Sequence, residues 1–518
     1  MYAGYSMLFY INKYSLLALV WVLIISALTI IKVAPENLNA DILINSVMSL
    51  QKLTLYYWGQ NRLLNILPLT TSLVKNPSLN LSVVLMLTSM SFYILLYFIS
   101  RAAVVLIKKK DEGELSFKVF LITSSVFVFI FTPHAISEMT IGHIEYSFPA
   151  LLLVFASLKL FLRQDDTEKW RSLSLPVAAI ILAIGLNPST LIPAFFISMA
   201  TAFKQKKIRL NTIVLLMASG LAFFVWSFVS KQYGSFTYNK FSLEIFYSGV
   251  QKVAGNLLST VNLPILLLLL AFILLGKIVF NVYVNNKSSD CRSIISYSTN
   301  AVILFSIGWL LLFSSSRWVE MNQFAWRYFI YIFFALIFLC SVYLSSFLNR
   351  LSARKSMIFA GATAFAATLF LASPFARLTF DEYKVFQRVN ALTEPGGRLY
   401  SGDYWVVWPS VMRDMMHGYE TYGLAYRGEA NKEAAKKYIS GKITENGNVF
   451  VFCLNDTIQN CVSLVNSIAG PLYAVGSTQP EKDVYLIEFV RQVPQLEFKG
   501  ADFLNLPSQV GIEKIQKK

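Results

Sequence analysis

Charged residues are scarce in this sequence. They make up 14% of the 518 residues and hydrophobic residues 55%, whereas soluble globular proteins carry about 25% charged residues. This composition excludes an ordinary soluble protein. The formal net charge is +16, but lysine and arginine lie mostly in short loops between apolar runs. That distribution orients membrane proteins, so we expect no nucleic-acid partner.

Signature motifs of nucleotide and metal chemistry are also missing. The sequence has no Walker loop, GxSxG elbow, HExxH helix, zinc-finger spacing or GxGxxG loop. Each of these motifs arranges side chains or backbone amides around a phosphate, a nucleophile or a metal. The sequence therefore gives no sign of a cytoplasmic nucleotide site.

Cysteine is rare too, with four residues. Cys291 falls in a loop expected in the cytoplasm, and Cys340 falls inside an apolar run. Cys453 and Cys461 fall in the C-terminal region, at the end of a β-like run and in the helical pattern after it. We expect a disulfide between them if that region faces an oxidising compartment, although spacing alone leaves two free cysteines as the alternative.

Long apolar runs are what the sequence has in abundance, and we count about eleven membrane-crossing segments. The runs are Ser15–Val33, Asn80–Ile107, Phe117–Phe131, Tyr146–Leu162, Leu173–Phe203, Leu210–Ser230, Val261–Val284, Ile295–Phe313, Tyr328–Leu348 and Met357–Ser373. Asn187-Pro188-Ser189 interrupts the fifth run, and because proline breaks helices we expect two short helices there. No small-residue cleavage site follows the first run, which we interpret as a retained anchor.

Basic residues in alternate loops predict the orientation, because such loops are typical of the cytoplasmic side. The basic positions are Lys13, Lys108–Lys110, Arg163, Lys169, Arg171, Lys204, Lys206, Lys207, Arg209, Lys287, Arg292, Arg350, Arg354 and Lys355. If the chain starts inside, the loops at residues 34–79, 132–145, 231–260 and 314–327 lie outside. The C-terminal region lies outside with them.

The character of the sequence changes after Ser373. Short β-like runs and helical patterns alternate there, which indicates a small α/β domain. The β-like runs are Arg398–Ser401, Val449–Leu454, Leu472–Val475 and Val484–Val490, and the helical patterns are Asn431–Ile439 and Thr457–Ile468. We therefore predict a polytopic α-helical membrane module over residues 1–373 and an external α/β domain over residues 374–518.

Two carboxylates follow the first apolar run, close to the expected membrane surface. A carboxylate there can take the proton of an acceptor hydroxyl that attacks an activated carbon. We expect Asp41 to be this base, with Glu36 as the second candidate. For either residue the alternative is a solvated loop acid.

Cationic and aromatic side chains in the external loops suit a phosphate and a sugar. Arg62, Arg317 and Arg327 are candidates for a donor phosphate, because a guanidinium binds phosphate oxygens through paired hydrogen bonds. Contact with membrane lipid headgroups is the alternative, which we favour for Lys231. Candidate substrate contacts in LYYWGQNRLLNILPL (residues 55–69) are Tyr57, Trp58, Gln60 and Asn61, although the tyrosine also suits the membrane interface.

Two further stretches carry candidate substrate contacts. In GHIE (Gly142–Glu145), His143 and Glu145 could supply a second acid, a metal ligand or a sugar contact, but two ligands do not define a metal site. In SGDYWVVWPS (residues 401–410) the candidates for a saccharide groove are Asp403, Tyr404, Trp405 and Trp408. Packing against the membrane module is the alternative for that stretch.

These features together resemble the GT-C class of membrane glycosyltransferases. The likeness lies in an early acid after the first span, a many-span body and an external α/β domain, and in the residues Asp41, Tyr56–Pro68 and Gly142–Glu145. Within that class, the chain resembles bacterial O-antigen glucosyltransferases of the phage serotype-conversion type. Such enzymes lie in the bacterial inner membrane, with the active site facing the periplasm.

The resemblance implies a mechanism as well as a fold. An external site has no ready supply of nucleotide sugar, so the natural donor is a sugar on a polyprenyl phosphate. The resemblance specifies undecaprenyl-phosphate glucose, a lipid-linked or growing O-antigen acceptor, Asp41 as base and inversion at the anomeric carbon. Ala40 stands where the common pattern has a second acid, which leaves open whether a divalent cation takes part.

Two rival classes share parts of this pattern. A polysaccharide polymerase or ligase would also work at the outer face, but with a larger arginine-rich external loop. A lipid-linked glycan transporter or flippase usually has charges near the bilayer midplane and repeated halves. The apolar runs here carry few central charges and show no repeat, so glycosyl transfer is favoured.

Overall fold

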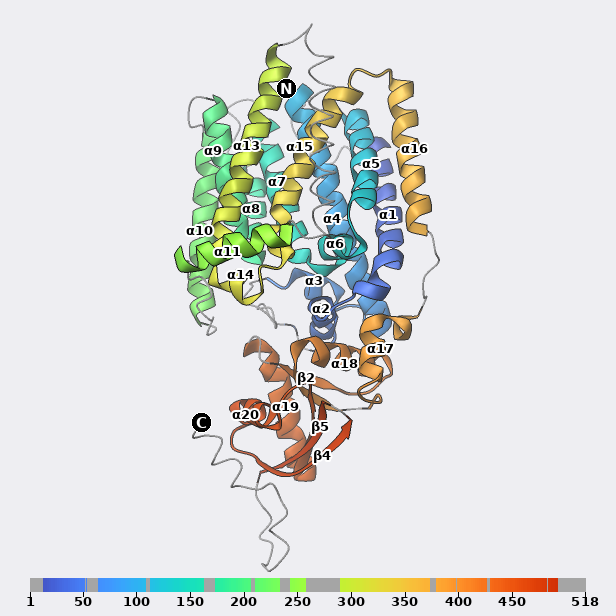
Figure 1. Ribbon diagram of the computed structural model, residues 1–518, viewed down its shortest axis with the longest axis vertical. Coiled ribbons are helices and arrows are strands. Elements are labelled where there is room, and N and C mark those ends of the chain that lie inside the picture. The colour runs from blue at the N-terminus through green and yellow to red at the C-terminus, as the bar shows by residue number, and fades with distance from the viewer. Residues whose placement is uncertain are drawn as a thin grey trace, which may run out of the picture. The chain divides into compact units, whose positions relative to one another are not determined.

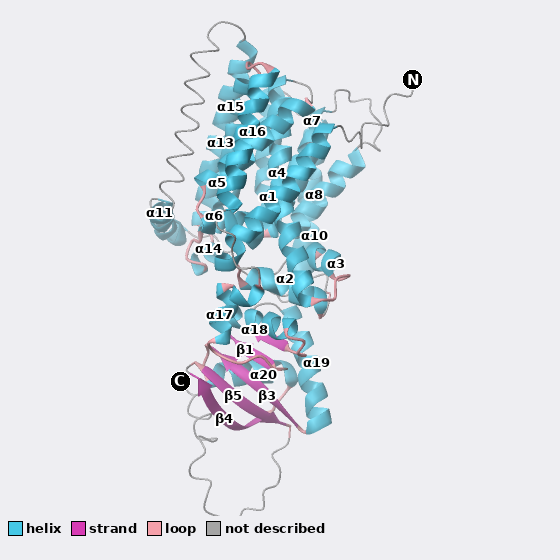
Figure 2. Cartoon of the chain, turned by 90° about the vertical axis from the view of Figure 1, so that its right-hand side faces the viewer, coloured by secondary structure: helices cyan, strands magenta, loops and turns pink. Residues whose placement is uncertain are grey.

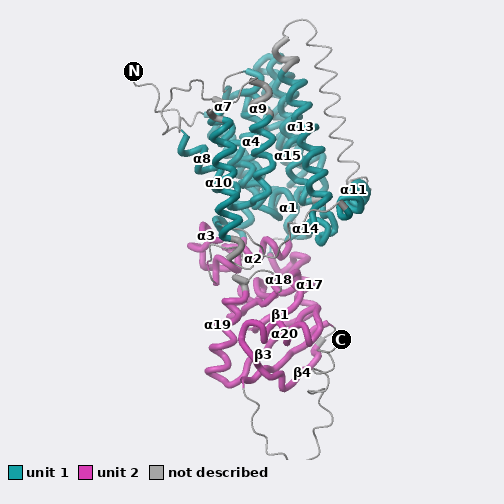
Figure 3. Tube along the Cα trace, turned by 90° about the vertical axis from the view of Figure 1, so that its left-hand side faces the viewer, with its two compact units in different colours: residues 1–38, 61–67, 82–379 teal, residues 39–60, 68–81, 380–518 magenta. Residues whose placement is uncertain are grey.

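The computed structural model describes residues 13–51, 53, 64–108, 112–162, 173–205, 210–232, 243–257, 289–372, 379–396, 398–425, 429–481 and 483–491. The chain divides into two compact units (Figure 3). Unit 1 comprises Met1–Leu38, Asn61–Leu67 and Ser82–Thr379, and unit 2 comprises Asn39–Gln60, Pro68–Leu81 and Phe380–Lys518. Residues 39–60 and 68–81, which sequence analysis assigned to the multi-span module, thus group with the C-terminal region.

Unit 1 is built of helices (Figure 1). They are α1 (Lys13–Asn37), α4 (Pro77–Lys108, whose first turn belongs to unit 2), α5 (Gly113–Ile130), α6 (Pro133–Ser137), η2 (Glu138–Gly142), α7 (Ile144–Leu162), α8 (Ser174–Leu186), η4 (Pro188–Thr190), α9 (Leu191–Gln205), α10 (Leu210–Gln232), α11 (Leu243–Leu257), α13 (Ser289–Ser314), α14 (Arg317–Met321), η5 (Trp326–Phe329), α15 (Ile330–Leu348) and α16 (Ala353–Ala372).

Within the described residues, seven helices are long and apolar enough to cross a membrane, or eight if the bent pair Pro133–Gly142 and Ile144–Leu160 is one span. Met217, Leu221 and Phe224 are exposed along one face of α10, as lipid contact requires. The predicted fold class is confirmed: a multi-pass helical membrane protein with a small α/β domain. The predicted run Val261–Val284 lies outside the described residues, so the number of spans stays a prediction.

Small residues bring the helices of unit 1 together. The buried residues of α16 include Ser356, Ala360, Ala364 and Ala367, whose spacing of three or four places them in one stripe. Small side chains let helices approach closely in lipid, where the hydrophobic effect does not drive helix association. Consistently, α16 packs on α5 and α1, and Lys118 of α5 donates to Ser356 Oγ at 2.9 Å.

The expected break in the run Leu173–Phe203 is present. α8 ends at Leu186, and the side chain of Asn187 accepts a hydrogen bond from Ser189 N at 3.1 Å. Pro188 then begins η4, which leads into α9. The run therefore forms two short helices, as its proline predicts.

Unit 2 contains a five-stranded sheet in the order β2-β1-β3-β5-β4 (Figure 2). β2, β1 and β3 are parallel to one another, and β5 pairs antiparallel with β3 and β4. Its elements are α2 (Ala40–Leu50), α3 (Ile66–Thr71, which begins in unit 1), η6 (Phe380–Glu382), α17 (Lys384–Asn390), β1 (Leu399–Gly402), α18 (Tyr404–Met416), β2 (Tyr422–Ala425), α19 (Glu429–Asn446), β3 (Asn448–Leu454), α20 (Ile458–Ala469), β4 (Tyr473–Glu481) and β5 (Val484–Val490).

Helices cover both faces of the parallel strands, as helical crossovers require. On one face, Val451 and Ile487 pack with Ile439 of α19 and Val465 of α20. On the other face, α18 lies against β2, where a Cβ on Gly423 would come 2.8 Å from the Trp408 ring. α2 packs against α18, which is how the helix after the first span joins the α/β region.

A buried ion pair holds α18 to the sheet. Arg413 and Asp414 are both fully buried, and Arg413 Nη2 donates to Asp414 Oδ1 at 2.8 Å. Tyr400 of β1 donates its hydroxyl to Asp414 Oδ2 at 2.8 Å. Burial, and then the Asp414 carboxylate, raise the pKa of Tyr400 to about 12, so this hydroxyl stays a donor at neutral pH.

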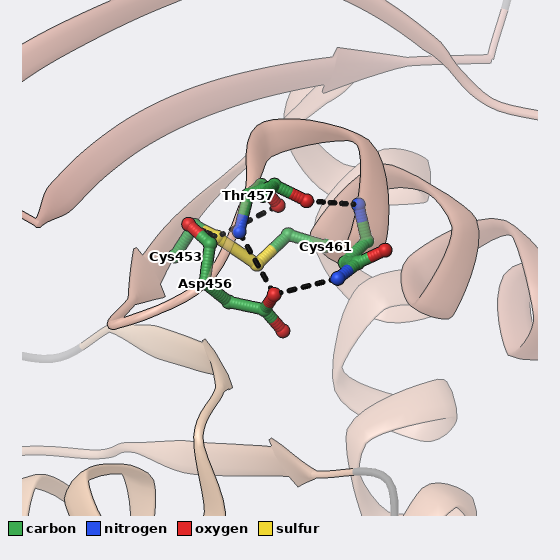
Figure 4. Close-up of a disulfide and its surroundings, with 5 residues drawn as sticks. Cys453, Asp456, Thr457 and Cys461 are labelled. Atoms are coloured by element: carbon green, nitrogen blue, oxygen red, sulfur yellow. Dashed lines mark hydrogen bonds between the residues drawn. A yellow bond between two sulfur atoms is a disulfide. The ribbon is translucent and has the colours of Figure 1, made fainter. Parts of the chain in front are cut away.

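A disulfide joins β3 to α20. Cys453 is bonded to Cys461, with their Cα atoms 5.9 Å apart (Figure 4). Beside it, Asp456 Oδ1 accepts hydrogen bonds from Thr457 N and Asn460 Nδ2, each at 2.8 Å. The cross-link therefore closes a short, internally bonded turn. Cys340, in α15, is free and buried.

Some elements differ from the sequence expectation. α17, α18 and β2 were not predicted, and α18 contains β-prone tryptophan and valine residues as well as Pro409 inside the helix. Its packing against α2 and the sheet outweighs these local preferences. The first helix continues through Pro35 to Asn37 rather than ending at Val33, so Glu36 lies in its last turn and not in a loop.

Gly402, at the end of β1, is expected to resist substitution. Its φ is +120°, and a Cβ there would lie 2.3 Å from Leu454 O. We expect Gly402→Ala to lower the free energy of unfolding by about 1–3 kcal/mol. Gly441→Ala in α19 is the matched control, because nothing lies within 4 Å of its added Cβ. Thermal unfolding of the purified variants tests this, and equal midpoints would contradict it.

The disulfide makes a prediction about redox state in the cell. We expect Cys453 and Cys461 to react with a thiol label only after reduction, because the bond occupies both sulfurs. Cys340 should react without reductant once the protein is denatured, and serves as the internal control. Peptide mass spectrometry reads out each site, and labelling of both bonded cysteines before reduction would refute the prediction.

Candidate functional site

Asp41 lies in the first turn of α2, shortly after the first span. Asn39 caps this helix, and its side chain accepts a hydrogen bond from Ile42 N at 3.3 Å. A carboxylate in the first turn also interacts favourably with the helix dipole. Asp41 is only 3% exposed, so it is not the solvated loop acid that the sequence left open.

Tyr404, from the first turn of α18, holds the Asp41 carboxylate. Its hydroxyl donates to Asp41 Oδ1 at 2.8 Å, across 363 residues of sequence. Tyr404 is itself 6% exposed, so it contacts the carboxylate inside unit 2 rather than lining an open groove. No local signal in the sequence could have revealed this partner, because it depends on the docking of α2 against α18.

Other contacts fix the rest of α2. Ser46 and Ser49 both donate to Asn80 Oδ1, at 2.7 and 3.0 Å. At the other end of the helix, Gln51 Nε2 donates to Thr421 O at 2.6 Å. The helix that carries Asp41 is therefore anchored along its whole length within unit 2.

Glu36, the alternative base, has a different environment. It lies in the last turn of α1 and is exposed. The structure thus distinguishes the two candidate acids by burial: Asp41 is buried with a defined hydrogen-bond donor, and Glu36 is exposed.

A second group of polar side chains lies within unit 1. His143 is held between two carboxylates: Nδ1 lies 2.9 Å from Glu145 Oε1, and Nε2 lies 3.0 Å from Glu138 Oε2. The His143 side chain is 2% exposed, and those of the glutamates 12% and 11%. The predicted neighbours His143 and Glu145 are thus in direct contact, and Glu138 completes the group.

The two hydrogen bonds determine the proton content of this triad. A neutral imidazole has one N–H donor, and an ionised carboxylate can only accept. Both contacts can be hydrogen bonds only if His143 is the imidazolium or one glutamate is protonated. The triad therefore carries one proton more than a neutral imidazole and two carboxylates would.

Backbone geometry brings the triad together. η2 and α7 meet at a break where the candidate span bends by 68°, and η2 has π-helical geometry, which is frequent at functional sites. Asn187 Nδ2 donates to Glu145 O at 2.7 Å, which connects the break after α8 to the triad. Arg327 is near enough to act electrostatically on Glu138.

Arg317 and Arg327, the other predicted phosphate-binding residues that the structure describes, have different hydrogen-bond partners. Arg317 donates to Glu320 Oε2 at 2.6 Å in an exposed pair, and Arg327 Nη2 donates to Asn322 Oδ1 at 3.4 Å. A phosphate would have to compete with the Arg317–Glu320 pair. Other predicted residues lie outside the described part: Tyr57, Trp58, Gln60, Asn61 and Arg62.

The two tryptophans of the predicted saccharide stretch (residues 401–410) differ in exposure. Asp403 caps α18, and its Oδ1 accepts from Trp405 N at 3.1 Å. Trp405 is 40% exposed, whereas Trp408 is fully buried. The Trp405 ring contacts the Tyr404 ring edge-on, with centroids 5.4 Å apart. An open indole therefore lies one side chain away from the ring that binds Asp41, while Trp408 belongs to the core.

No group of three or more His, Cys, Asp or Glu side chains arranged to hold a metal ion occurs in the described part of the chain. In the triad, both ring nitrogens of His143 already face carboxylate oxygens. The three groups therefore point at one another rather than at a common empty point.

Removing His143 should destabilise unit 1. His143→Leu would remove the donor shared by the buried Glu138 and the partly buried Glu145. Breaking a buried ion pair in this way costs about 3–5 kcal/mol. His134→Leu is the matched control, because His134 is exposed in the neighbouring α6. Thermal unfolding of the detergent-solubilised protein measures the difference, and a wild-type midpoint for His143→Leu would show that the triad does not support the fold.

No protein-family model and no curated protein sequence matches the chain. Similar solved structures include apo ArnT from Cupriavidus metallidurans, with a TM-score of 0.46, 9% identity, and coverage of 92% of this chain and 98% of that chain. ArnT bound to undecaprenyl phosphate gives a TM-score of 0.43, 12% identity, and coverage of 93% and 98%.

A third similar structure is an oligosaccharyltransferase from Archaeoglobus fulgidus in complex with Zn and sulfate. Its TM-score is 0.33, with 11% identity, and the match covers 84% of this chain and 67% of that chain. Because these identities are low and all three TM-scores are below 0.5, the chemistry has to be argued from the residues of this chain.

Proposed function

We propose that this protein is a membrane glycosyltransferase of the GT-C type, which moves a sugar from a polyprenyl-phosphate donor to a glycan or lipid-linked glycan acceptor. The observation that carries the proposal is Asp41: a buried carboxylate, oriented by Tyr404, just after the first membrane span. A carboxylate so placed can receive a proton close to the membrane surface, where a lipid-linked substrate presents its head group.

The proposed reaction is a single displacement. The acceptor hydroxyl oxygen attacks the anomeric carbon and forms the new glycosidic bond, and the bond from that carbon to the phosphate oxygen breaks. The leaving polyprenyl phosphate keeps the electron pair, and the hydroxyl proton passes to Asp41. Attack from the face opposite the leaving group inverts the anomeric carbon. Because Tyr404 engages Oδ1, we assign the proton to Oδ2.

Other residues have proposed supporting roles. Arg62, Arg317 and Arg327 are the candidates for the donor phosphate, since guanidinium groups keep their charge and match phosphate geometry. Trp405 offers an exposed aromatic face on which an acceptor sugar can stack. His143 and Glu145 stay candidates for substrate contact, although their contact with each other favours a role in holding the bend.

The finer assignments follow the sequence resemblance. They are glucose as the sugar, undecaprenyl phosphate as the lipid, O-antigen as the acceptor, and the periplasmic face of a bacterial inner membrane as the location. The disulfide suits an oxidising compartment such as the periplasm. Undecaprenyl phosphate is also the lipid bound in one similar structure, but the proposal rests on Asp41 and its surroundings.

Asp41→Asn tests the proposal directly. Purified protein is given undecaprenyl phosphate carrying glucose, galactose or N-acetylglucosamine, together with lipid-linked glycan from the host. Loss of a general base lowers kcat by about 10²–10⁴-fold, and KM should change little. Glu36→Gln is the matched control and should keep near wild-type activity.

The assay also separates the rival functions. One added sugar per acceptor supports the proposal, whereas addition of whole oligosaccharide units would indicate a polymerase or ligase. Absence of transfer from every donor by the wild-type protein, or full activity of Asp41→Asn, would overturn the proposed function.

A further inference from the structure

We infer that Tyr404 is a positioning residue for the proposed base, and that the α/β region thereby takes part in the chemical step. The inference rests on the proposed function and deepens it. The observation that supports it is the buried hydrogen bond from the Tyr404 hydroxyl to Asp41 Oδ1, which is 2.8 Å long. Tyr404 acts through Asp41 and not on the substrate.

The hydrogen bond can orient the carboxylate because Asp41 is buried. A carboxylate rotates readily about its last side-chain bond, and a donor fixed on one oxygen removes that freedom. The second oxygen then keeps a constant direction toward an acceptor hydroxyl. Hydrogen bonds from a neutral donor to a charged acceptor are also stronger than bonds between neutral groups, so this contact favours one orientation of the carboxylate.

The Tyr404 ring is itself held in place by α18. It packs edge-on against the rings of Trp405 and Trp408, with centroids 5.4 and 6.3 Å away. Just before it, Asp403 caps the helix, and Asp403 N donates to Leu454 O of β3 at 3.0 Å. The hydroxyl that meets Asp41 is therefore positioned by the helix and by the sheet.

The opposite end of α18 is fixed by a different interaction. The Arg413–Asp414 pair and the Tyr400 hydroxyl connect it to β1. Tyr400 and Tyr404 thus make the same chemical contact, a phenol donating to a buried aspartate at 2.8 Å, within one unit. Of these two tyrosines, Tyr404 is the one that contacts the proposed base, so the chain itself provides a matched comparison.

The experiment compares Tyr404→Phe with Tyr400→Phe in the full-length purified protein. The donor is the one from the panel above that supports the fastest wild-type transfer. We expect Tyr404→Phe to lower kcat roughly 10- to 100-fold, because the proposed base loses the donor that sets its direction and small misplacements of a catalytic group cost rates of this order. KM for donor and acceptor should stay within about twofold, because the inference assigns the lost hydroxyl to Asp41 and not to either substrate.

Tyr400→Phe separates this role from a structural one. It should lower the thermal midpoint, while kcat per folded molecule stays near wild type. A second comparison uses the Asp41→Asn background, in which loss of the Tyr404 hydroxyl should lower residual transfer no further.

Three results would overturn the inference. They are an unchanged kcat for Tyr404→Phe, an equal loss of kcat per folded molecule in Tyr400→Phe, and the same fold-loss in the presence and absence of the Asp41 carboxylate. If Asp41→Asn is inactive while Tyr404→Phe has wild-type kcat, the positioning role fails and the proposed function stands. If Asp41→Asn is fully active, both fail.

Discussion

A carboxylate that leaves water must find hydrogen-bond donors inside the protein, because an unpaired buried charge is strongly destabilising. In the part of the chain that the structure describes, three groups meet this constraint: Asp41–Tyr404, Glu138–His143–Glu145 and Tyr400–Asp414–Arg413. Each group joins parts of the chain that local structure alone would leave apart: the helix after the first span and α18, the two sides of a bent span, and α18 and its sheet. The polar groups proposed for chemistry are therefore also those that hold their surroundings together.

The two units pack in different ways. In unit 1, small residues on α16 allow close helix contact, and apolar side chains remain exposed on α10, as lipid permits. In unit 2, a sheet buries a conventional apolar core against α19 and α20. α2, which carries Asp41, belongs to unit 2 and packs against α18. The proposed base thus lies buried in the α/β region while following directly after a membrane span.

Elements with strong local sequence signals were predicted well. The helix break at Asn187 and the bounds of β5 agree with the sequence pattern, because proline and a run of alternating β-formers act over a few neighbouring residues. α18 was missed, since its tryptophans, valines and Pro409 favour other conformations. GHIE was recognised as polar, and only the fold showed that His143 and Glu145 share the triad with Glu138.

By itself, the sequence determined that the chain crosses the membrane many times, that a small α/β region follows, and which acids are available near the first span. Hydrophobic run length and residue type carry that information locally. Only the tertiary structure decided that Asp41 is buried while Glu36 is exposed, and that Tyr404 is the hydrogen-bond partner of Asp41. That choice depends on the docking of α2 against α18, and side-chain contacts across 363 residues leave no periodic pattern in a single sequence.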